Sequence, residues 1–358
     1  MISEKPSFTI LCSGFGSFYQ QALGLLAGFK KLNFRAELEV LVKKEREDYS
    51  KCKGNWVIGI GSWRDWEILY QKPKKLGIEV FPWLVSDDKV LKYVEEINKA
   101  KVIFVTSNFC KNTFLKAGVK KEKMELIYEG IDTHFWKPIS KNKIERMKKL
   151  LNLPNDKVIL LTIGGDATSK GAQETLRALK SLSHLNFLYV LKTMVGGDAF
   201  FEGEKEERIY SGNPLEKKVR YFMGNFSNEF ILSLINLCDI YVAPSRHEGF
   251  GLPHVQAMAC KKPVITCKGT AAEETSIDGV TGFVVSSRPF HWKNAKGYLV
   301  DGVRANISEL KLAIEKLVKN KRLREKMGED ARRHVVKNFE AKETAKNFIE
   351  KLKKYERD

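Results

Sequence analysis

The chain has 358 residues, a formal net charge of +18, 43% hydrophobic residues and 30% charged residues. This composition excludes a disordered tail or a fibre, and the length indicates a globular protein of two domains. The six cysteines are scattered without a C-x-x-C pair, which argues against a zinc site and a disulfide framework. No apolar run reaches the roughly 18 residues of a spanning helix, and no signal-peptide pattern opens the chain. We therefore expect a cytoplasmic protein whose positive surface favours anionic partners.

Apolar, β-branched segments alternate with segments of helical period in the first part of the chain, which predicts βα units and a parallel sheet. A strand is expected at residues 8–12, followed by a glycine-rich turn with Gly14 and Gly16 and by a helix. Further strands are expected at residues 36–42, 56–60, 78–83, 102–106 and 124–128. These elements predict an N-terminal domain over residues 1–138.

A second series of the same kind follows a basic segment, residues 139–155, which we expect to be a linker. It begins with a strand at residues 157–163, a turn containing Gly165 and a helix from Lys170. Later strands are expected at residues 187–191, 219–222, 240–243, 263–266 and 282–285. This second domain, residues 156–335, repeats the strand, glycine turn and helix plan of the first, which indicates an α/β protein of two Rossmann-like halves.

The last helix, in residues 336–358, has one apolar stripe, because apolar residues recur at intervals of three and four. We expect the stripe to dock on the domains, and a return of this helix to the N-terminal domain is one way to achieve that. A membrane-binding or partner-binding surface is the alternative.

Ligands of open parallel sheets bind beyond the carboxyl ends of the strands, where helix N-termini present unpaired N–H groups. Two such domains facing one another would place these ends on both walls of a cleft. Lys170 opens a helix after a glycine turn, and its charge opposes the helix dipole unless an anion offsets it. A bound phosphate would offset it, and a solvated lysine is the alternative.

The most informative segment, residues 244–260, reads PSRHEGFGLPHVQAMAC. Gly249 and Gly251 let the backbone approach a ligand closely, and the helix that follows can direct N–H groups at a diphosphate. Glu248 would place a carboxylate beside that anion, which is favourable only if the acid binds sugar hydroxyls. His247 and His254 flank the glycines, but no trio with metal-ligand spacing is visible, so ordinary polar contacts are expected.

This segment is followed by PVI and by ETSIDGVTGFVV, and YEGIDTHFWKP precedes it. Together these motifs resemble glycosyltransferase family 4, within the glycosyl transferases group 1, which are retaining enzymes that use nucleotide diphosphate sugars. The resemblance is strong over residues 157–285 and weak over the first domain. It implies the GT-B fold, in which two Rossmann-like domains with parallel sheets face a central cleft, the N-terminal one on the acceptor side and the C-terminal one on the donor side.

The same resemblance implies roles for individual residues. Glu248 is the first acid of the family's E-x7-E motif and would contact the donor sugar, and Gln256 stands at the second position, where the family binds ribose. The family's phosphate-binding Arg and Lys fall at Gly165 and Lys170, so the arginine is missing. Lys192 or Arg246 is the candidate to replace its charge.

We therefore expect Glu248 and Lys170 to be catalytic. The residues expected to bind the donor are Gly14, Gly16, Gly165, Lys192, Arg246, Gly249, Phe250, Gly251, Leu252, Gln256 and Glu274. For Glu274, helix capping is the alternative role.

The function implied by the resemblance is that of a retaining, hexosyltransferase-type enzyme. It would move a sugar from a nucleotide diphosphate sugar to a hydroxyl of a glycan, lipid or small-molecule acceptor, with no metal or other cofactor required. Two alternatives stay open: a GT-B nucleotide-sugar epimerase or phosphorylase, and a non-catalytic sugar-nucleotide-binding protein. No specific nucleic acid is expected as a partner, because the basic residues are dispersed.

Two features of the first domain concern the acceptor. Lysine pairs such as Lys30-Lys31 and Lys43-Lys44 leave two interpretations open, a well-solvated basic protein and peripheral contact with anionic lipid at the inner face of the membrane. Trp63, Trp66 and Trp83, near strand ends, are either buried packing residues or a platform for the acceptor.

Overall fold

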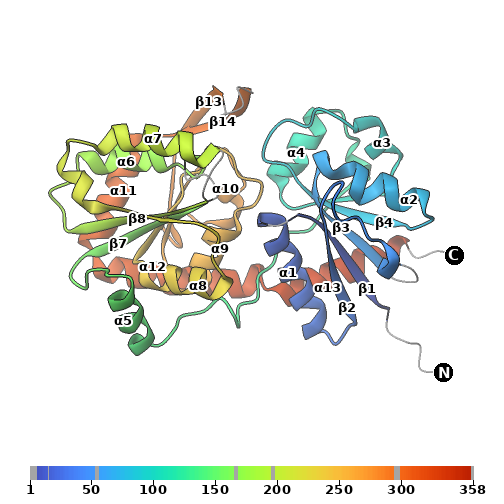
Figure 1. Cartoon of the computed structure of the whole chain (residues 1–358), viewed down its shortest axis with the longest axis horizontal. Helices are drawn as coiled ribbons and strands as arrows, with labels where there is room; N and C mark the ends of the chain where they lie inside the picture. Colours follow the sequence, from blue (N-terminus) through green and yellow to red (C-terminus); the bar gives the residue numbers. More distant parts are fainter. Residues whose placement is uncertain are drawn as a thin grey trace. The chain divides into compact units, whose positions relative to one another are not determined.

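The computed structural model describes residues 6–14, 16–52, 56–164, 168–194, 198–293 and 299–355. The chain divides into two compact units (Figure 1). The first unit consists of Met1–Thr133 and Lys337–Asp358, and the second unit is His134–Val336. Each unit contains a six-stranded sheet.

The sheet of the first unit is parallel throughout, in the order β2-β1-β3-β4-β5-β6. All six residues of β1 are buried, as expected for a strand of a parallel sheet that is covered on both faces. The strands are β1 (Phe8–Ser13), β2 (Ala36–Leu41), β3 (Trp56–Ser62), β4 (Val80–Val85), β5 (Ile103–Val105) and β6 (Met124–Leu126). The α-helices are α1 (Ser17–Lys31), α2 (Lys72–Lys75), α3 (Val94–Lys99), α4 (Asn108–Lys116) and α13 (Ala341–Leu352).

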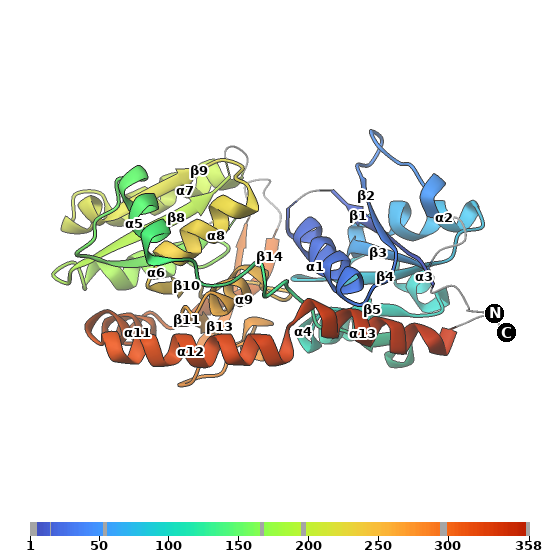
Figure 2. The ribbon, with the colours of Figure 1, turned by 90° about the horizontal axis from the view of Figure 1, so that it is seen from below.

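Gly28 of α1 allows this helix to approach the start of α13 closely. A Cβ atom on Gly28 would lie 2.2 Å from the carbonyl oxygen of Ala341, so only glycine permits this approach. Helix α13 packs along α1 (Figure 2). Its apolar stripe is buried, and the ring of Phe348 meets that of Trp83 edge-on at 4.8 Å. The stripe expected from the sequence therefore forms part of the core of the first unit.

The sheet of the second unit is also parallel, in the order β12-β11-β10-β7-β8-β9. The strands are β7 (Val158–Ile163), β8 (Phe187–Thr193), β9 (Val219–Met223), β10 (Ile240–Val242), β11 (Val264–Cys267) and β12 (Gly282–Val285). The α-helices are α5 (Lys141–Leu150), α6 (Ala172–Lys180), α7 (Asp198–Tyr210), α8 (Asn228–Leu237), α9 (Leu252–Ala259), α10 (Ala272–Thr275), α11 (Ile307–Lys319) and α12 (Lys321–Asn338). The segment expected as a linker belongs to this unit and contains α5.

An antiparallel hairpin is added to the second unit between β12 and α11. It consists of β13 (Ser287–Lys293) and β14 (Leu299–Ala305). The register pairs Arg288 with Arg304 and Phe290 with Gly302, so these four residues share one face. The sequence pattern predicted no strand in this segment, so the hairpin is an addition to the expected elements.

The expected fold class is confirmed, since both units are α/β with parallel six-stranded sheets. The strand expected at residues 78–83 begins later, as β4, because Gly77 adopts φ 74° and the N–H of Ile78 donates to the carbonyl of Pro73 at 3.0 Å, which closes the preceding helical turn. All six cysteines are free and buried. Among the described residues, no helix has both the length and the apolar composition needed to cross a membrane.

Candidate active site

Lys170 and Glu248 lie at the point of the second sheet where the strand order reverses. Strands β7 and β10 run side by side there, and the loops that follow them lead to α6 and α9. Open α/β sheets bind ligands beyond the carboxyl ends of the strands at this switch point. The Nζ atom of Lys170 lies 2.7 Å from Oε2 of Glu248, across 78 residues of sequence. The two residues expected to be catalytic therefore meet as an ion pair.

The carboxylate of Glu248 is fixed through one of its oxygens. Besides Lys170, the hydroxyl of Ser245 donates a hydrogen bond to Oε2 at 3.2 Å, and Ser245 is buried. Within the described part of the chain, no donor hydrogen-bonds the second oxygen, Oε1. The side chain keeps 12% of its surface exposed, so Oε1 is the atom left for a ligand hydroxyl.

A glycine brings the loops of Lys170 and Glu248 together. Gly171 adopts φ 83°, and a Cβ atom there would lie 2.4 Å from the carbonyl oxygen of Pro244. Beside this contact, the N–H of Arg246 donates to the carbonyl of Ser169 at 2.8 Å. The β7–α6 loop and the β10–α9 loop are therefore held together by backbone contacts, which sets the position of the ion pair.

The start of α9 depends on a second glycine. Gly251 caps the helix with φ 98°, and a Cβ atom there would lie 2.0 Å from Cε1 of His254. The ring of His254 is buried, and its Nε2 lies 2.5 Å from Oγ1 of Thr275. Burial lowers the pKa of His254 to about 4, so the ring is neutral at pH 7 and packs under the loop.

The side chains after Glu248 point into the protein. Phe250 and Leu252 are 2% and 5% exposed, and Gly249 and Gly251 are buried as well, so these four residues present no side chain to a ligand. Gln256 lies on α9 and is 5% exposed. Its amide forms no hydrogen bond within the described part of the chain, which leaves its donor and acceptor unused.

The guanidinium of Arg246 forms an ion pair with Glu174, an acid that the sequence analysis did not identify. Its Nη2 donates to Oε1 of Glu174 at 2.9 Å, and the two side chains are 3% and 0% exposed. A further bond from Nη2 reaches Oε1 of Gln173 at 3.2 Å. The guanidinium therefore lies under the loop of Glu248 and not at its surface, so Lys192 is the stronger candidate for the charge of the missing arginine.

Lys192 lies at the carboxyl end of β8, beside the end of β7. Burial lowers its pKa below the ordinary value. Its Nζ lies 6.0 Å from the ring centroid of Phe226, and it forms no ion pair among the described residues. A partly desolvated cation without a counter-charge is favourable beside an anionic ligand.

The other expected residues are dispersed. Gly14 and Gly16 lie between β1 and α1 of the first unit with φ 79° and 95°, and added Cβ atoms would meet nothing within 4 Å, so both glycines serve the backbone conformation. Gly165 lies outside the described residues. Glu274 lies half-buried on α10, where its neighbour Glu273 accepts a hydrogen bond from the N–H of Gly269 at 3.0 Å.

The three tryptophans that could have formed an acceptor platform are buried. Trp63 is 5% exposed, and Trp66 and Trp83 are 0% exposed. Their rings pack within the cores of the first unit, so the packing interpretation holds. In unit 2, no trio of metal-ligating side chains within the described residues includes Glu248 or His254.

Glu174 could have been found from the sequence. It follows the glycine turn within the first turn of α6, where an acid is favourable beside the helix N-terminus. Its pairing with Arg246 could not be found in this way, because 72 residues separate them.

Comparison with known proteins identifies the family of the chain. Residues 143–334, more than half of the 358, match the family described as glycosyl transferases group 1. The chain belongs to this family. Over 348 residues it is 25% identical to "Uncharacterized glycosyltransferase MJ1069" of Methanocaldococcus jannaschii, and the aligned region covers 96% of this chain and 74% of that protein. It is 27% identical over 256 residues to "Capsular polysaccharide biosynthesis glycosyltransferase CapM" of Staphylococcus aureus, with 69% of this chain and 56% of that protein covered.

Solved structures share the fold of this glycosyltransferase-family chain. Anabaena Alr3699/HepE in complex with UDP and glucose has a TM-score of 0.78 and 16% identity, with 98% and 100% of the two chains covered. A glycosyltransferase from Rickettsia africae has a TM-score of 0.78 and 17% identity, with 98% of each chain covered. At this identity the likeness establishes the shared GT-B fold.

Proposed function

We propose that the protein is a retaining glycosyltransferase of family 4 and of hexosyltransferase type, which moves a sugar from a nucleotide diphosphate sugar to an acceptor hydroxyl. The ion pair of Lys170 and Glu248 at the switch point of the second sheet carries this proposal. The pair brings a cation and a carboxylate to the end of the strands, and we propose that they bind the diphosphate and its sugar next to one another.

Positive charge for the leaving diphosphate comes from several groups of the second unit. Lys170 precedes Gly171, the N-cap residue of α6, and Lys192 lies near the carboxyl end of β8 without an ion-pair partner among the described residues. The N-terminus of α9 follows Gly251 and adds backbone N–H groups. Fixed cations and dipoles of this kind stabilise negative charge as it develops on the leaving group.

Retention is proposed to follow from attack on the same face. The acceptor oxygen forms its bond to the anomeric carbon while the bond from that carbon to the diphosphate breaks, and a diphosphate oxygen takes the acceptor proton. The proposed step needs no nucleophile from the protein, and Lys170 and Ser245 fix the carboxylate of Glu248 through its Oε2, which leaves Oε1 for the sugar. The role of Glu248 is to hold the sugar through hydroxyl groups.

Gln256 is proposed to bind the ribose of the donor. Its buried amide has unused hydrogen-bonding groups, and it lies on α9, the helix that follows the loop of Glu248. The HepE structures contain UDP, which supports uridine nucleotides as the first donors to test. The alternatives, an epimerase or phosphorylase and a non-catalytic binding protein, make different predictions in the same assay.

Release of nucleoside diphosphate from a panel of nucleotide sugars, with and without acceptors, tests the proposed function. We expect release that depends on the acceptor, and we expect Glu248→Gln to lower transfer at least about tenfold while nucleoside diphosphate affinity changes little. Glu229→Gln, an exposed acid of α8, is the matched control. Equal losses of transfer and binding would contradict the role of Glu248, and tight binding without turnover would support the non-catalytic alternative.

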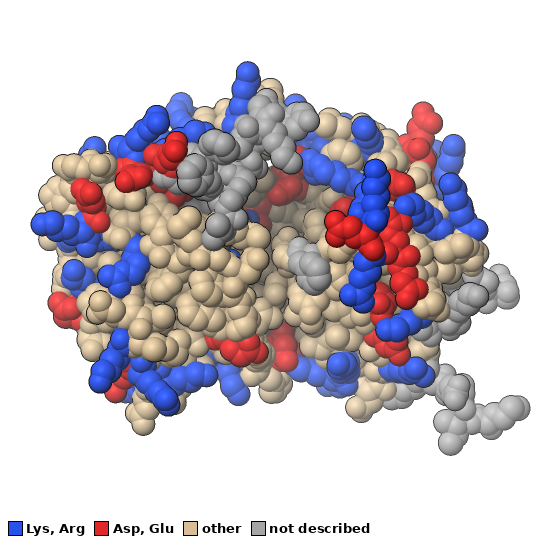
Figure 3. Space-filling model, viewed as in Figure 1, with Lys and Arg blue, Asp and Glu red and all other residues tan. Residues whose placement is uncertain are grey.

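A cytoplasmic location and contact with the inner face of an anionic membrane remain proposals. The basic residues of the first unit are interleaved with acids on the face in Figure 3. Lys31 pairs with Asp132 and Glu340 at 2.6 and 2.7 Å, and Lys43 pairs with Glu67 at 2.7 Å. This pairing reduces the positive charge offered to lipid. Co-sedimentation with anionic vesicles at low salt tests the contact, and its absence would eliminate it.

A further inference from the structure

Three arginines converge on one buried carboxylate behind the hairpin β13–β14. The Oε1 atom of Glu174 lies 2.9 Å from Nη2 of Arg246, 3.3 Å from Nε of Arg304 and 4.0 Å from Nη1 of Arg177. The guanidinium of Arg304 stacks on the ring of Phe290, with its Cζ 3.6 Å from the ring centroid. Stacking holds the guanidinium plane and leaves its N–H edge available for an anion.

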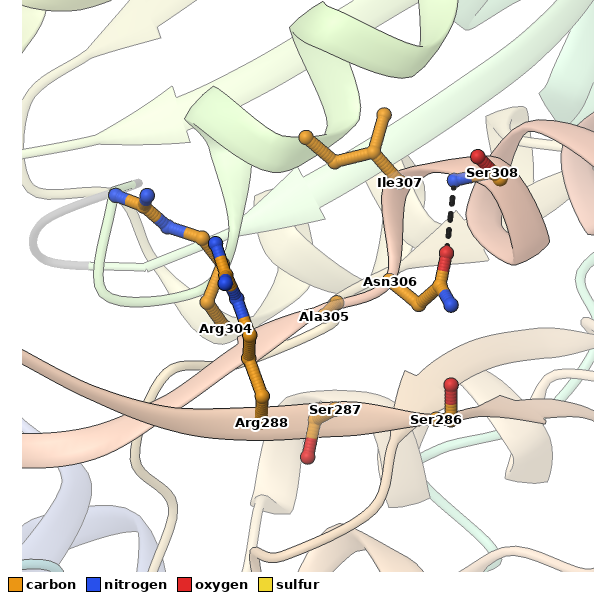
Figure 4. A pocket seen from close by; sticks show the side chains of 8 residues that line it. All are labelled: Ser286, Ser287, Arg288, Arg304, Ala305, Asn306, Ile307 and Ser308. Carbon is orange, nitrogen blue, oxygen red and sulfur yellow. Dashed lines mark hydrogen bonds between the residues drawn. The ribbon is translucent and has the colours of Figure 1, made fainter.

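A fourth arginine adds to this group. Arg288 lies directly opposite Arg304 in the β-ladder, and both side chains leave the same face of the hairpin (Figure 4). Like charges placed opposite one another across two strands are destabilising. Arg288 forms no ion pair among the residues that the structure describes. Three guanidinium groups thus share the carboxylate of Glu174, and Arg288 adds a fourth positive charge beside Arg304, which leaves an excess of positive charge.

The pKa of Arg304 reflects this excess. It is lowered from the ordinary value by burial in the first place, and then by the charges of Arg246, Arg177 and Arg288, although Glu174 opposes the shift. The Nε–H of Arg304 is buried and lacks a hydrogen bond of good geometry. An additional anion beside the guanidinium would offset the excess positive charge.

A pocket of about 280 Å³ opens beside these side chains. Arg288 and Arg304 line it on one side, and three serines and the start of α11 line the other (Figure 4). Asn306 caps α11 by accepting from the N–H groups of Ser308 and Glu309. This volume is below the roughly 300–1,000 Å³ of pockets for drug-sized ligands, so it fits a small ligand.

One acid also lies near the pocket. The carboxylate of Glu309 accepts hydrogen bonds from the N–H and the hydroxyl of Ser286, at 2.7 and 2.5 Å, and from Asn306 at 3.1 Å. These bonds and Lys268 lower the pKa of Glu309, so it is charged. The acid is thus engaged by its own partners, and the arginines remain in excess over Glu174 and Glu309 together.

We propose that this pocket is a second anion site, which binds the phosphate group of a small molecule through Arg288 and Arg304. A guanidinium group can donate two parallel hydrogen bonds to phosphate oxygens. The hydroxyls of Ser286 and Ser287 already donate to Glu309 and to the carbonyl of Lys268, whereas that of Ser308 donates to no acceptor within the described residues and can add a bond to the anion. None of the residues proposed to bind the donor lines the pocket. The site is therefore separate from that of the nucleotide diphosphate sugar.

The test is isothermal titration of the whole protein with inorganic phosphate and pyrophosphate. Arg288→Glu is the test variant, and Lys293→Glu is the control, because Lys293 lies on the opposite face of the same hairpin and its change alters the net charge equally. We expect Arg288→Glu to weaken binding at least about tenfold and Lys293→Glu to weaken it less than about twofold. Equal weakening by both variants, or no binding to the unaltered protein, would overturn the proposal.

Two further titrations distinguish the second anion site from the donor site, and a phosphorylated metabolite from inorganic phosphate. Binding to the second site should persist in Lys170→Ala, because Lys170 belongs to the donor site, and loss of all phosphate binding in that variant would overturn the proposal. A hexose phosphate that binds at least about tenfold tighter than inorganic phosphate, and loses affinity in Arg288→Glu, would identify a phosphorylated metabolite as the occupant. Equal affinities would identify inorganic phosphate.

Discussion

The guanidinium of Arg246 and the carboxylate of Glu174 form an ion pair that is almost completely buried, with 3% and 0% of the side chains exposed. Arg246 lies two residues before Glu248 in sequence, and its carbonyl accepts a hydrogen bond from the N–H of Val303 in the hairpin at 2.7 Å. A structural ion pair and the hairpin therefore hold the loop of Glu248 from behind.

Removal of Glu174 should destabilise the second unit strongly. Breaking a buried pair from one side leaves an uncompensated charge, and we expect Glu174→Ala to lower the free energy of unfolding by about 3–5 kcal/mol. Glu315→Ala is the control, because its pair with Lys319 at 2.5 Å lies on the surface of α11 and should contribute less than about 1 kcal/mol. Urea unfolding measures both, and similar losses would show that the buried pair contributes little.

Gly251→Ala should destabilise the protein more than the same change at another glycine with positive φ. An alanine at Gly251 would collide with the ring of His254, whereas Gly212 has φ 69° and no atom within 4 Å of an added Cβ. We expect Gly212→Ala to lower the free energy of unfolding by about 1–2 kcal/mol, because of backbone strain alone, and Gly251→Ala to lower it more.

Unfolding in urea and affinity for nucleoside diphosphate should be measured together for these two variants. Gly251→Ala should lower both stability and affinity, since it displaces the start of α9. Gly212→Ala should leave affinity unchanged. If the two variants behaved alike, the contact with His254 would not shape the loop.

The sequence was sufficient to predict the parallel sheets, because the buried strands of βα units are apolar runs that lie between glycine turns. It also placed Lys170 and Glu248 at strand ends, where the structure joins them at 2.7 Å. The partner of Arg246 could not be predicted, since local patterns carry no information on a contact across 72 residues. The hairpin was missed although Phe290 and Trp292 alternate with polar residues, because Pro289 and the charged residues interrupt the apolar pattern.

The proposed phosphate contact of Lys192 can be tested by its pH dependence. Burial lowers the pKa of Lys192 from 10.5, so the ammonium loses its proton at a lower pH than an exposed lysine. Because diphosphate binds the charged form, affinity should fall as the pH rises through the lowered pKa, by up to about tenfold per pH unit above it. Lys192→Arg keeps its charge at these pH values and should show no such fall.

Both proteins should be titrated with the same nucleoside diphosphate, so that ionisation of the ligand cancels in the comparison. Lys180→Arg, at the end of α6, is the control for the substitution itself. Parallel pH profiles for the unaltered protein and Lys192→Arg would remove Lys192 from the diphosphate site.

His254 should make the stability of the second unit sensitive to acid. Its pKa of about 4 in the folded protein lies below the ordinary 6.5, so between these pH values the unfolded chain binds a proton that the folded chain does not. The free energy of unfolding therefore falls as the pH drops from 6.5 towards 4, and the stabilisation is complete above 6.5. The difference of the two pKa values corresponds to about 3 kcal/mol.

Urea unfolding of the unaltered protein and of His254→Gln, at about pH 4.5 and about pH 7.5, measures this contribution. Glutamine does not titrate, so the variant should lose less stability on acidification by roughly 2–3 kcal/mol, even if it is less stable at both pH values. His184→Gln, which removes an exposed histidine, is the control for the substitution itself. If His254→Gln kept the full acid sensitivity, this ring would not be its cause.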